Sequence, residues 1–346
     1  MFSRNLRETL RLVTTHRGRN NLCKLINKIF NKRLSPALAH LVGPTQFGFI
    51  KGRDTTHAVR ASDKLLKTHY TLVALDFARA YTNTNTSLLF SLLSSLGLDS
   101  TGRAWFTHLF KPRQGHILVN GRIIGKCRMA RGLRQGDPLS PALFNIFVSA
   151  IPFIIARIDS EIVVIQFADD TILAFPKGAS VTHERIAHIL NTLAHVLHIP
   201  INHTKTQITS LLNLDASFRH VGYILPITPS SIDTKFKEIA EHFKRLAGWS
   251  KTLRFPTHIR AQVFNKLALG KLTHPARVGI PSGEIMRELE WAQRIFLGKT
   301  FKNKQTKKYT YFGRKISEYA HTQEEGGISL IYAPTHIKAI FEKVTL

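Results

Sequence analysis

Short apolar runs alternate with helical patterns over the first two thirds of the chain. Residues 71–77 (TLVALDF) form one strand-like run, and residues 162–175 (IVVIQFADDTILAF) predict a β-hairpin whose turn carries two adjacent aspartates. Residues 207–212 and 218–225 are two further strand candidates. This mixture predicts a sheet layer with helices on one side, ending near residue 225.

Helical periods fill most of the remaining chain. Residues 4–69 are mostly helical in pattern, apart from the turn-prone stretch 43–53. Residues 87–96 predict a helix with Gly97 as its left-handed C-cap, and residues 181–198 predict another. After Pro226 the apolar positions recur at three and four residues, which predicts a separate basic helical lobe. Its helices are expected at residues 235–247, 257–272 and 284–297.

Two local patterns add to this outline. Residues 117–119 and 122–124 flank Asn120-Gly121, a preferred hairpin dipeptide. Residues 138–156 are uncharged and nearly long enough to cross a bilayer. They also contain Pro141 and Pro152 and begin with a helix-start pattern, so we interpret them as a buried core helix with a break near Pro152. A transmembrane span is the alternative.

The charge of the chain points to a polyanionic partner. Lys and Arg number 49 against 22 Asp and Glu, which gives a formal net charge of +27. The surplus is distributed along the chain, and this suits an extended phosphate backbone better than a small anionic ligand. A generally basic protein without such a partner is the alternative.

The two cysteines, Cys23 and Cys127, are too few for a disulfide framework or a cysteine-rich zinc knuckle, so we expect no zinc and an intracellular location. The first residues are rich in arginine and poor in acid. They predict either an organellar targeting segment, mitochondrial for example, or a basic arm on nucleic acid.

Three aspartates carry the candidate chemistry. Asp169 and Asp170 lie at the turn of the predicted hairpin, and Asp76 ends the strand-like run before it in the chain. Adjacent carboxylates against an apolar core repel each other unless a cation neutralises them. A divalent metal with oxygen ligands is the simplest neutraliser, and three carboxylates are the minimum set for two-metal phosphoryl transfer.

A second motif strengthens this interpretation. In residues 131–145 (RGLRQGDPLSPALFN), glycines and prolines fix an irregular turn that leads into a helix, and Arg131, Arg134 and Gln135 project from it. A purely structural turn does not need these cationic and amide groups. The start of the helix also offers backbone N–H groups to a phosphate or a base.

Together these residues resemble the reverse transcriptases of the non-LTR (LINE-type) retrotransposon group, which are related to group II intron enzymes. The matching segments run in the family's order from about residue 20 to residue 335. They are residues 46–53 (QFGFIKGR), 75–85 (LDFARAYTNTN), 131–144 (RGLRQGDPLSPALF), 167–170 (FADD), 201–208 (INHTKTQI), 218–225 (FRHVGYIL) and 324–330 (EEGGISL).

The resemblance implies an α+β right-hand polymerase with a small antiparallel palm sheet, packed helices and a helical thumb. Residues 1–70 would form fingers and a basic N-terminal region, and residues 71–225 the palm, with residues 110–135 contributing to the fingers. Residues 226–346 would form the thumb and a basic C-terminal region. The implied reaction extends a primer 3′-end with dNTPs on an RNA template, without a membrane.

The resemblance also implies roles for single residues. Two Mg²⁺ ions, for which Mn²⁺ can substitute, would bind Asp76, Asp169, Asp170 and the Phe77 carbonyl. Lys205 would protonate the departing pyrophosphate. The implied substrate contacts are Lys51, Arg53, Tyr81 (which would exclude a ribose 2′-hydroxyl), Arg134, Gln135, Phe167 and Ala168, and the implied primer grip is Val221, Gly222 and Tyr223.

The chain departs from the family pattern in three respects. Thr82 stands where an acid usually follows the aromatic residue, the fingers look abbreviated, and we expect a standalone copy without an endonuclease. Two alternatives therefore stay open: a catalytically degenerate, maturase-like or bystander RNA-binding protein, and an RNA-dependent RNA polymerase.

Overall fold

A computed structural model of the chain describes residues 11–13, 17–110, 113–120, 122–129, 131–210, 218–250, 255–297, 300–302, 309–311 and 330–345. The contacts divide the chain into two compact units, Met1–Val221 and Gly222–Leu346, which we call the first and the second unit. Each unit has a hydrophobic core of its own. The division into fingers, palm and thumb stays a prediction.

The first unit is organised around a four-stranded antiparallel sheet with the strand order β5-β6-β2-β7. The predicted hairpin and the strand before Asp76 are thereby confirmed. β7 is shorter than predicted, and residues 211–212 of that prediction lie outside the described residues. The strands are β2 (Thr71–Leu75), β5 (Val163–Phe167), β6 (Asp170–Phe175) and β7 (Gln207–Thr209).

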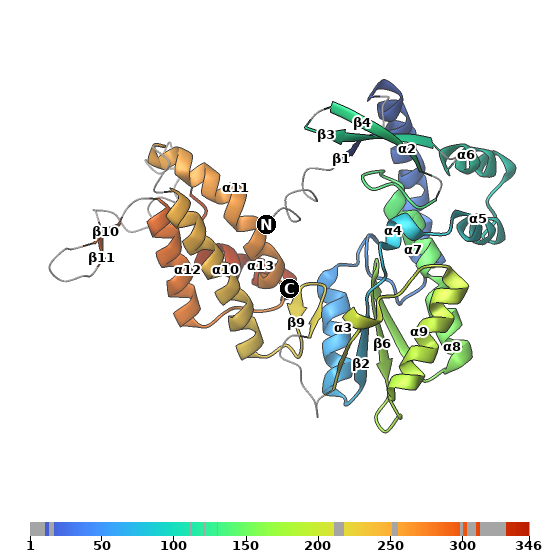
Figure 1. Cartoon of the computed structure of the whole chain (residues 1–346). Coiled ribbons are helices and arrows are strands. Elements are labelled where there is room, and N and C mark those ends of the chain that lie inside the picture. Colours follow the sequence, from blue (N-terminus) through green and yellow to red (C-terminus); the bar gives the residue numbers. More distant parts are fainter. Residues whose placement is uncertain are drawn as a thin grey trace. The chain divides into compact units, whose positions relative to one another are not determined.

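Both faces of this sheet are buried. Val73 and Leu173 belong to the main core cluster of the first unit, whereas Leu72 and Ile172 are fully buried outside that cluster. Successive side chains of a strand point to opposite faces, so helices must cover both sides. The prediction of helices on one side only is wrong, because these strands are apolar on both faces. Figure 1 shows α3 (Thr55–Lys67) on one side of β2 and β6, and α8 (Ala150–Ile158) and α9 (His183–Leu197) on the other.

The long apolar segment folds as two core helices. α7 (Ser140–Val148) and α8 meet at Ser149, just before Pro152, which confirms the predicted break. Ser140–Ile158 has the length and the apolar composition of a membrane span, with a mean hydropathy of 1.8, and half of it is buried. Every residue of α7 except Pro141 is buried. This packing supports the interpretation as core helices.

A second sheet of the first unit has the order β1-β3-β4. The predicted hairpin is confirmed and longer than expected, and Asn120 has a φ of +48° at its turn, while Gly121 lies outside the described residues. The helical prediction is wrong at β1, because pairing with β3 imposes an extended backbone there. The elements are β1 (Arg11–Val13), β3 (Arg113–Val119), β4 (Arg122–Met129), α2 (Arg17–Leu41), α4 (Ala80–Asn83), α5 (Thr86–Ser95) and α6 (Ser100–Phe110).

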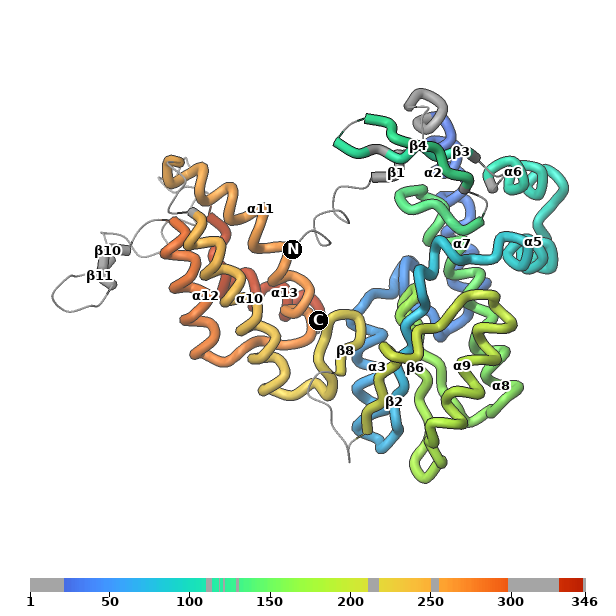
Figure 2. Tube along the Cα trace, in the orientation of Figure 1, coloured from blue at the N-terminus to red at the C-terminus, as the bar shows by residue number. Residues whose placement is uncertain are grey.

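The second unit is helical, and its three predicted helices are confirmed. Phe243, Phe264 and Phe296, one from each helix, meet in its core with ring centroids 5.1 and 5.3 Å apart. Figure 2 traces these neighbouring helices. The prediction missed a fourth helix, α13, which packs against α11 and α12. The elements are β9 (Tyr223–Ile224), α10 (Pro229–Ser250), α11 (Thr257–Ala276), α12 (Gly283–Phe296), β10 (Thr300–Lys302), β11 (Tyr309–Tyr311) and α13 (Ala333–Thr345).

Two expectations near the unit boundary and the C-terminus have different outcomes. The strand predicted over residues 218–225 is interrupted. β8 (Arg219–His220) ends before Val221 and Gly222, which have φ angles of +50° and +82°. A left-handed backbone cannot continue an extended strand, so one continuous strand is a wrong prediction. Residues 324–329 of the EEGGISL segment lie outside the described residues.

Phe147 in α7 tests the core of the first unit. Its side chain is fully buried, so Phe147→Ala should lower the free energy of unfolding by about 3–5 kcal/mol. Phe153→Ala in α8 removes the same ring from a position that is 73% exposed and should change stability little. Thermal and urea unfolding measure both values, and equal losses in the two variants would contradict the placement of α7 in the core.

Candidate active site

The sheet register brings the three aspartates to one end of the sheet. The β2–β6 ladder ends with Leu75 opposite Thr171, so Asp76 lies at the next register position, opposite Asp170. Phe167 and Asp170 form the last pair of the β5–β6 ladder. Ala168 and Asp169 are therefore the two central residues of the hairpin turn. The three carboxylates come from two strands and the turn between β5 and β6.

Their electrostatic coupling appears at Asp170. The pKa of this carboxyl group is raised from 3.8 to about 6. Partial burial of the carboxyl group is the largest cause, although the residue as a whole is still exposed to solvent. The negative charges of Asp169 and then Asp76 raise the pKa further. Both effects disfavour the ionised form. The three carboxylates thus lie within electrostatic reach of one another.

This donor set fits a divalent metal with oxygen ligands. Among the described residues, no three His, Cys, Asp or Glu side chains already converge closely enough to enclose an ion. The carboxylates instead form an open group with an uncompensated negative charge, and Mg²⁺ completes its shell with waters and substrate phosphates. Three repelling carboxylates at one sheet end are the residues that such an ion would neutralise.

A downstream segment fixes the chain on either side of Phe77. Asn202 N–H donates to the Asp76 carbonyl, and Ala78 N–H donates to the Pro200 carbonyl, each at 2.8 Å. These two bonds form an isolated bridge between Phe77 and Ile201 and leave the Phe77 carbonyl out of the pairing. The carbonyl that was predicted as a metal ligand is therefore not used by this bridge.

The same segment brings a cation to the aspartates. Lys205 lies in a short 3₁₀ turn, and its Nζ is 3.6 Å from Oδ2 of Asp76. Both side chains are largely exposed, so this ion pair contributes little stability in water. The structure thus brings Lys205 and Asp76 together. The catalytic role of Lys205 stays a prediction.

Tyr81 lies beside the aspartates. Its ring stacks on Phe144 with centroids 4.5 Å apart, and its pKa is raised to about 12, first by burial and then by the charge of Asp169. Leu133 N–H donates to the Tyr81 carbonyl at 2.6 Å. The motif of residues 131–144 therefore fixes both the backbone and the ring of Tyr81.

Gly132 makes a second close contact with this segment. It has a φ of +85°, and a Cβ at this position would lie 2.3 Å from the Thr82 carbonyl oxygen. A side chain would collide with backbone there, so the first glycine of RGLRQG is required by close approach. Thr82 itself is exposed, and its hydroxyl donates to the Arg79 carbonyl.

The two residues of this motif that are predicted to contact substrate, Arg134 and Gln135, differ in their surroundings. Gln135 is exposed in the turn before α7. Arg134 donates from Nη2 to the Leu109 carbonyl at 2.6 Å and thereby connects the turn to α6. Asp137 accepts from Asn27 of α2 at 2.7 Å and from Leu139 N–H. Arg134 thus has a structural bond, and the substrate contacts of Arg134 and Gln135 stay predictions.

The segment of residues 46–53 lies against the catalytic hairpin. Gln46 forms a parallel bridge with Gln166 of β5, and Phe47 N–H donates to the Gln166 carbonyl at 2.8 Å. Arg53 donates from Nη1 to the carbonyls of Gly43 and Gln46 and thereby closes this loop, whereas Lys51 is exposed. The structure thus places this segment beside the hairpin. The phosphate contacts of Lys51 and Arg53 stay predictions.

Sequence reasoning missed two groups in this segment. Gln46 is fully buried and hydrogen-bonds the turn at Ala168, which no local pattern reveals. Phe49 is 59% exposed at a φ of +56°, and its ring centroid lies 6.4 Å from that of Phe167. A non-glycine residue at positive φ with an exposed aromatic ring is the kind of signal that only the structure supplies.

The predicted primer-grip residues fall on the unit boundary. Val221 closes the first unit, and Gly222 and Tyr223 open the second. Tyr223 donates to the carbonyl of His274, and the two rings are 4.3 Å apart. Their contact with a primer stays a prediction.

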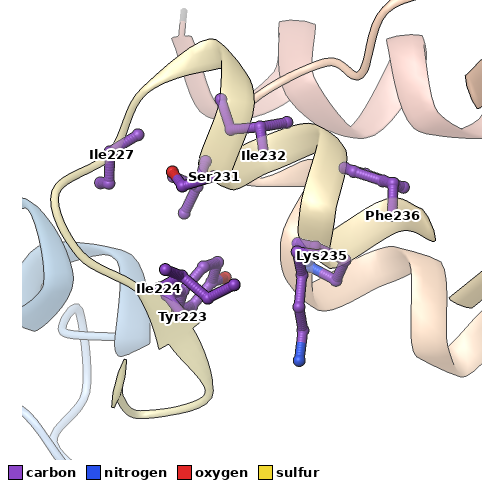
Figure 3. A pocket seen from close by; sticks show the side chains of 9 residues that line it. Tyr223, Ile224, Ile227, Ser231, Ile232, Lys235 and Phe236 are labelled. Atoms are coloured by element: carbon purple, nitrogen blue, oxygen red, sulfur yellow. The ribbon is translucent and has the colours of Figure 1, made fainter. Parts of the chain in front are cut away.

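A small pocket of the second unit lies beside Tyr223. Figure 3 shows Ile224, Ile227 and Ile232 around it, with the Lys235 amine directed away. Its volume of about 20 Å³ has room for about one water molecule, so it is not a nucleotide site.

Comparisons with known proteins agree with this geometry. Residues 11–259, more than half of the chain, match the family described as reverse transcriptase (RNA-dependent DNA polymerase). The chain belongs to this family. Its fold is accordingly the right-hand polymerase fold with small antiparallel sheets, as the sequence predicts.

Individual relatives support the non-LTR assignment. Two matches are to retrovirus-related Pol polyproteins from the type-1 retrotransposable element R2 of Popillia japonica. One is 28% identical over 115 residues, which cover 30% of this chain and 18% of the relative. The other is 30% identical over 167 residues, which cover 44% and 23%. The chain therefore spans less than a quarter of the length of these relatives.

Solved structures with some likeness include telomerase from Candida albicans in complex with a fragment of telomeric RNA. That chain is 12% identical, with a TM-score of 0.40, over 80% of this chain and 51% of the telomerase chain. Apo telomerase from Candida tropicalis, truncated from its C-terminal domain, has 13% identity and a TM-score of 0.41 over 59% and 43%.

The raised pKa of Asp170 predicts how stability depends on pH. A carboxyl group whose folded-state pKa is raised contributes stability below its unfolded value, 3.8, and loses it as the pH rises through about 6. Asp170→Asn should therefore raise the melting temperature in metal-free buffer at pH 7.5. The difference from the parent should disappear as the pH falls towards 4.

Glu161→Gln provides the control, because it removes a negative charge from an exposed position in the loop before β5. Its melting temperature should follow that of the parent at every pH. Thermal melts between pH 4 and 8 measure all three proteins. A melting temperature of Asp170→Asn below that of the parent at pH 7.5 would refute the coupling of the carboxylates.

Proposed function

We propose that the chain is an RNA-directed DNA polymerase that extends a primer 3′-end with dNTPs on an RNA template and releases pyrophosphate. The observation that carries this proposal is the meeting of Asp76, Asp169 and Asp170 at one end of the sheet, where burial and then the charges of Asp169 and Asp76 raise the pKa of Asp170. Membership of the reverse transcriptase family supports the reaction type. RNA as the template follows from the family.

The three aspartates and the Phe77 carbonyl would hold two Mg²⁺ ions, which would activate the primer hydroxyl and neutralise the triphosphate and the pyrophosphate. The protein supports this role by fixing its ligands before substrate arrives. Asp76 is fixed by its backbone bond to Asn202, and Asp169 and Asp170 by the hairpin. Fixed ligands avoid reorganisation during the reaction.

The surrounding cations would handle the phosphate charge. Lys205, already 3.6 Å from Asp76, is suited to donate a proton to the departing pyrophosphate. Lys51 is exposed on the loop that packs beside the hairpin, and this position suits a contact with the triphosphate. The net charge of +27 suits a nucleic-acid partner with an extended backbone.

Tyr81 would select deoxyribonucleotides. Its ring is held by Phe144 and its backbone by Leu133, so it cannot easily move away from a ribose 2′-hydroxyl. Gln135 in the neighbouring turn would position template and nucleotide. Phe167 and Ala168 would line the nucleotide site from the hairpin side.

We also propose an organellar location, such as the mitochondrion.

Primer extension tests the polymerase activity. The parent should extend a DNA primer on an RNA template with dNTPs and Mg²⁺, and Mn²⁺ should substitute. Asp169→Asn and Asp170→Asn should each lower the rate by more than about 100-fold, because even the outer-shell partners of a metal are worth about 10–100-fold.

The same assay separates the second candidate function. An inert parent that still binds RNA tightly would support a degenerate, RNA-binding relative instead. That alternative draws on the net charge of +27, because basic residues can bind RNA without metal binding by the three aspartates.

Two Tyr81 variants test the selection of sugar. Tyr81→Ala should raise the incorporation of ribonucleotides relative to deoxyribonucleotides, because it removes the ring that meets the 2′-hydroxyl. Tyr81→Phe keeps the ring and its stack on Phe144 and should keep the parent's selectivity. The ratio of kcat/KM for a dNTP and its matching rNTP measures the effect, and an unchanged ratio in Tyr81→Ala would remove Tyr81 from this role.

A further inference from the structure

The turn that carries Asp169 has an unfavourable backbone. Ala168, its first central residue, has a φ of +55°, a region that L-residues with a Cβ rarely adopt. Glycine is the usual residue at this place in a two-residue hairpin. A non-glycine residue keeps such a conformation only where its surroundings determine it. Contacts with neighbouring residues must therefore hold Ala168 at this positive φ.

Gln46, from another part of the chain, makes the contacts that hold Ala168 in this conformation. Its side chain is fully buried, and its Oε1 accepts from Ala168 N–H at 2.8 Å, while Nε2 donates to the Ala168 carbonyl at 3.4 Å. One amide group thus binds both polar backbone groups of the strained residue. The two residues are 122 positions apart, so this contact is purely tertiary.

Gly48 and Asn145 hold the glutamine and the loop in place. Gly48 N–H donates to the same Oε1 at 2.8 Å, and Asn145 of α7 donates to the Gly48 carbonyl at 2.5 Å. A Cβ on Gly48 would lie only 2.5 Å from Ala168 N. The loop therefore touches the turn backbone to backbone, and Asn145, which is also fully buried, connects the contact to the core helix.

We infer that Gln46 is a positioning residue that holds the Ala168–Asp169 turn in the geometry required for metal binding by Asp169 and Asp170. The inference rests on the proposed function, in which these aspartates are metal ligands. In this role Gln46 acts through the backbone of Ala168, to which both of its amide atoms bond. The buried bonds, rather than the sequence of the turn, define where the carboxylates point.

Gln46→Met tests the inference with a matched control, Gln166→Met. Both glutamines are fully buried next to the same hairpin, and Gln166 donates to the Val148 carbonyl at 3.1 Å instead of to the turn. Both variants should lose some thermal stability. Only Gln46→Met should weaken Mn²⁺ binding, by about 10–100-fold, as is typical for partners that orient metal ligands.

Three measurements on the full chain separate positioning from general stability. Electron paramagnetic resonance titration gives the Mn²⁺ dissociation constant without any need for activity. Hydrogen exchange at the Ala168 amide should accelerate in Gln46→Met and stay slow in Gln166→Met. In primer extension, Gln46→Met should lower kcat and raise the Mg²⁺ concentration for half-maximal rate, with little change in the KM for dNTP.

Gly48→Ala is the second variant, for use where Gln46→Met does not fold. It forces the loop away from Ala168 and should shift the Mn²⁺ dissociation constant in the same direction. The inference is overturned if both variants bind Mn²⁺ like the parent, or if Gln166→Met weakens binding as much as Gln46→Met does. An inert parent that binds Mn²⁺ would refute the polymerase proposal alone, because the titration still compares the variants.

Discussion

Mutual repulsion among Asp76, Asp169 and Asp170 is the constraint on which the first unit depends. The five register pairs between β2 and β6 fix the strand ends and leave the carboxylates no freedom to separate. Burial is the largest cause of the raised pKa of Asp170, and the charges of Asp169 and Asp76 raise it further. Lys205 offsets part of the charge from a solvent-exposed position, where an ion pair is weak. In the proposed function, divalent metal ions would neutralise the remaining charge.

Backbone contacts from distant segments hold the strand ends against this repulsion. The segment around Asn202 binds the backbone of Asp76, and the loop around Gln46 binds the turn before Asp170. Leu133 fixes Tyr81 from a third segment. The contacts of Asn202 and Leu133 use only main-chain groups, whereas the contact with the turn depends on the side chain of Gln46. The buried helix α7 supports two of them, through Asn145 and Phe144.

The sequence predicts those features that have a local pattern. The hairpin, the strand before Asp76 and the helices of the second unit follow from apolar periodicity, and the adjacent acids mark the site. The features it misses are tertiary. β1 is a strand because β3 pairs with it. α3 covers the second face of the sheet, where the prediction placed no helix. The run at residues 218–225 breaks where Val221 and Gly222 adopt a left-handed backbone. Gln46 is an ordinary polar residue in the sequence, and only its burial against Ala168 shows its importance.

At Thr82, where the chain departs from the family pattern, the side chain and the backbone have different surroundings. Its hydroxyl bonds the carbonyl of Arg79 within its own turn and faces solvent, so an acid there is not part of the carboxylate group. Its carbonyl, by contrast, lies where any Cβ on Gly132 would have to go. The Thr82 side chain is therefore exposed, whereas any side chain at position 132 would collide with the backbone of Thr82. The restriction belongs to the motif of residues 131–144, because that motif approaches closely enough for Leu133 to bind the backbone of Tyr81.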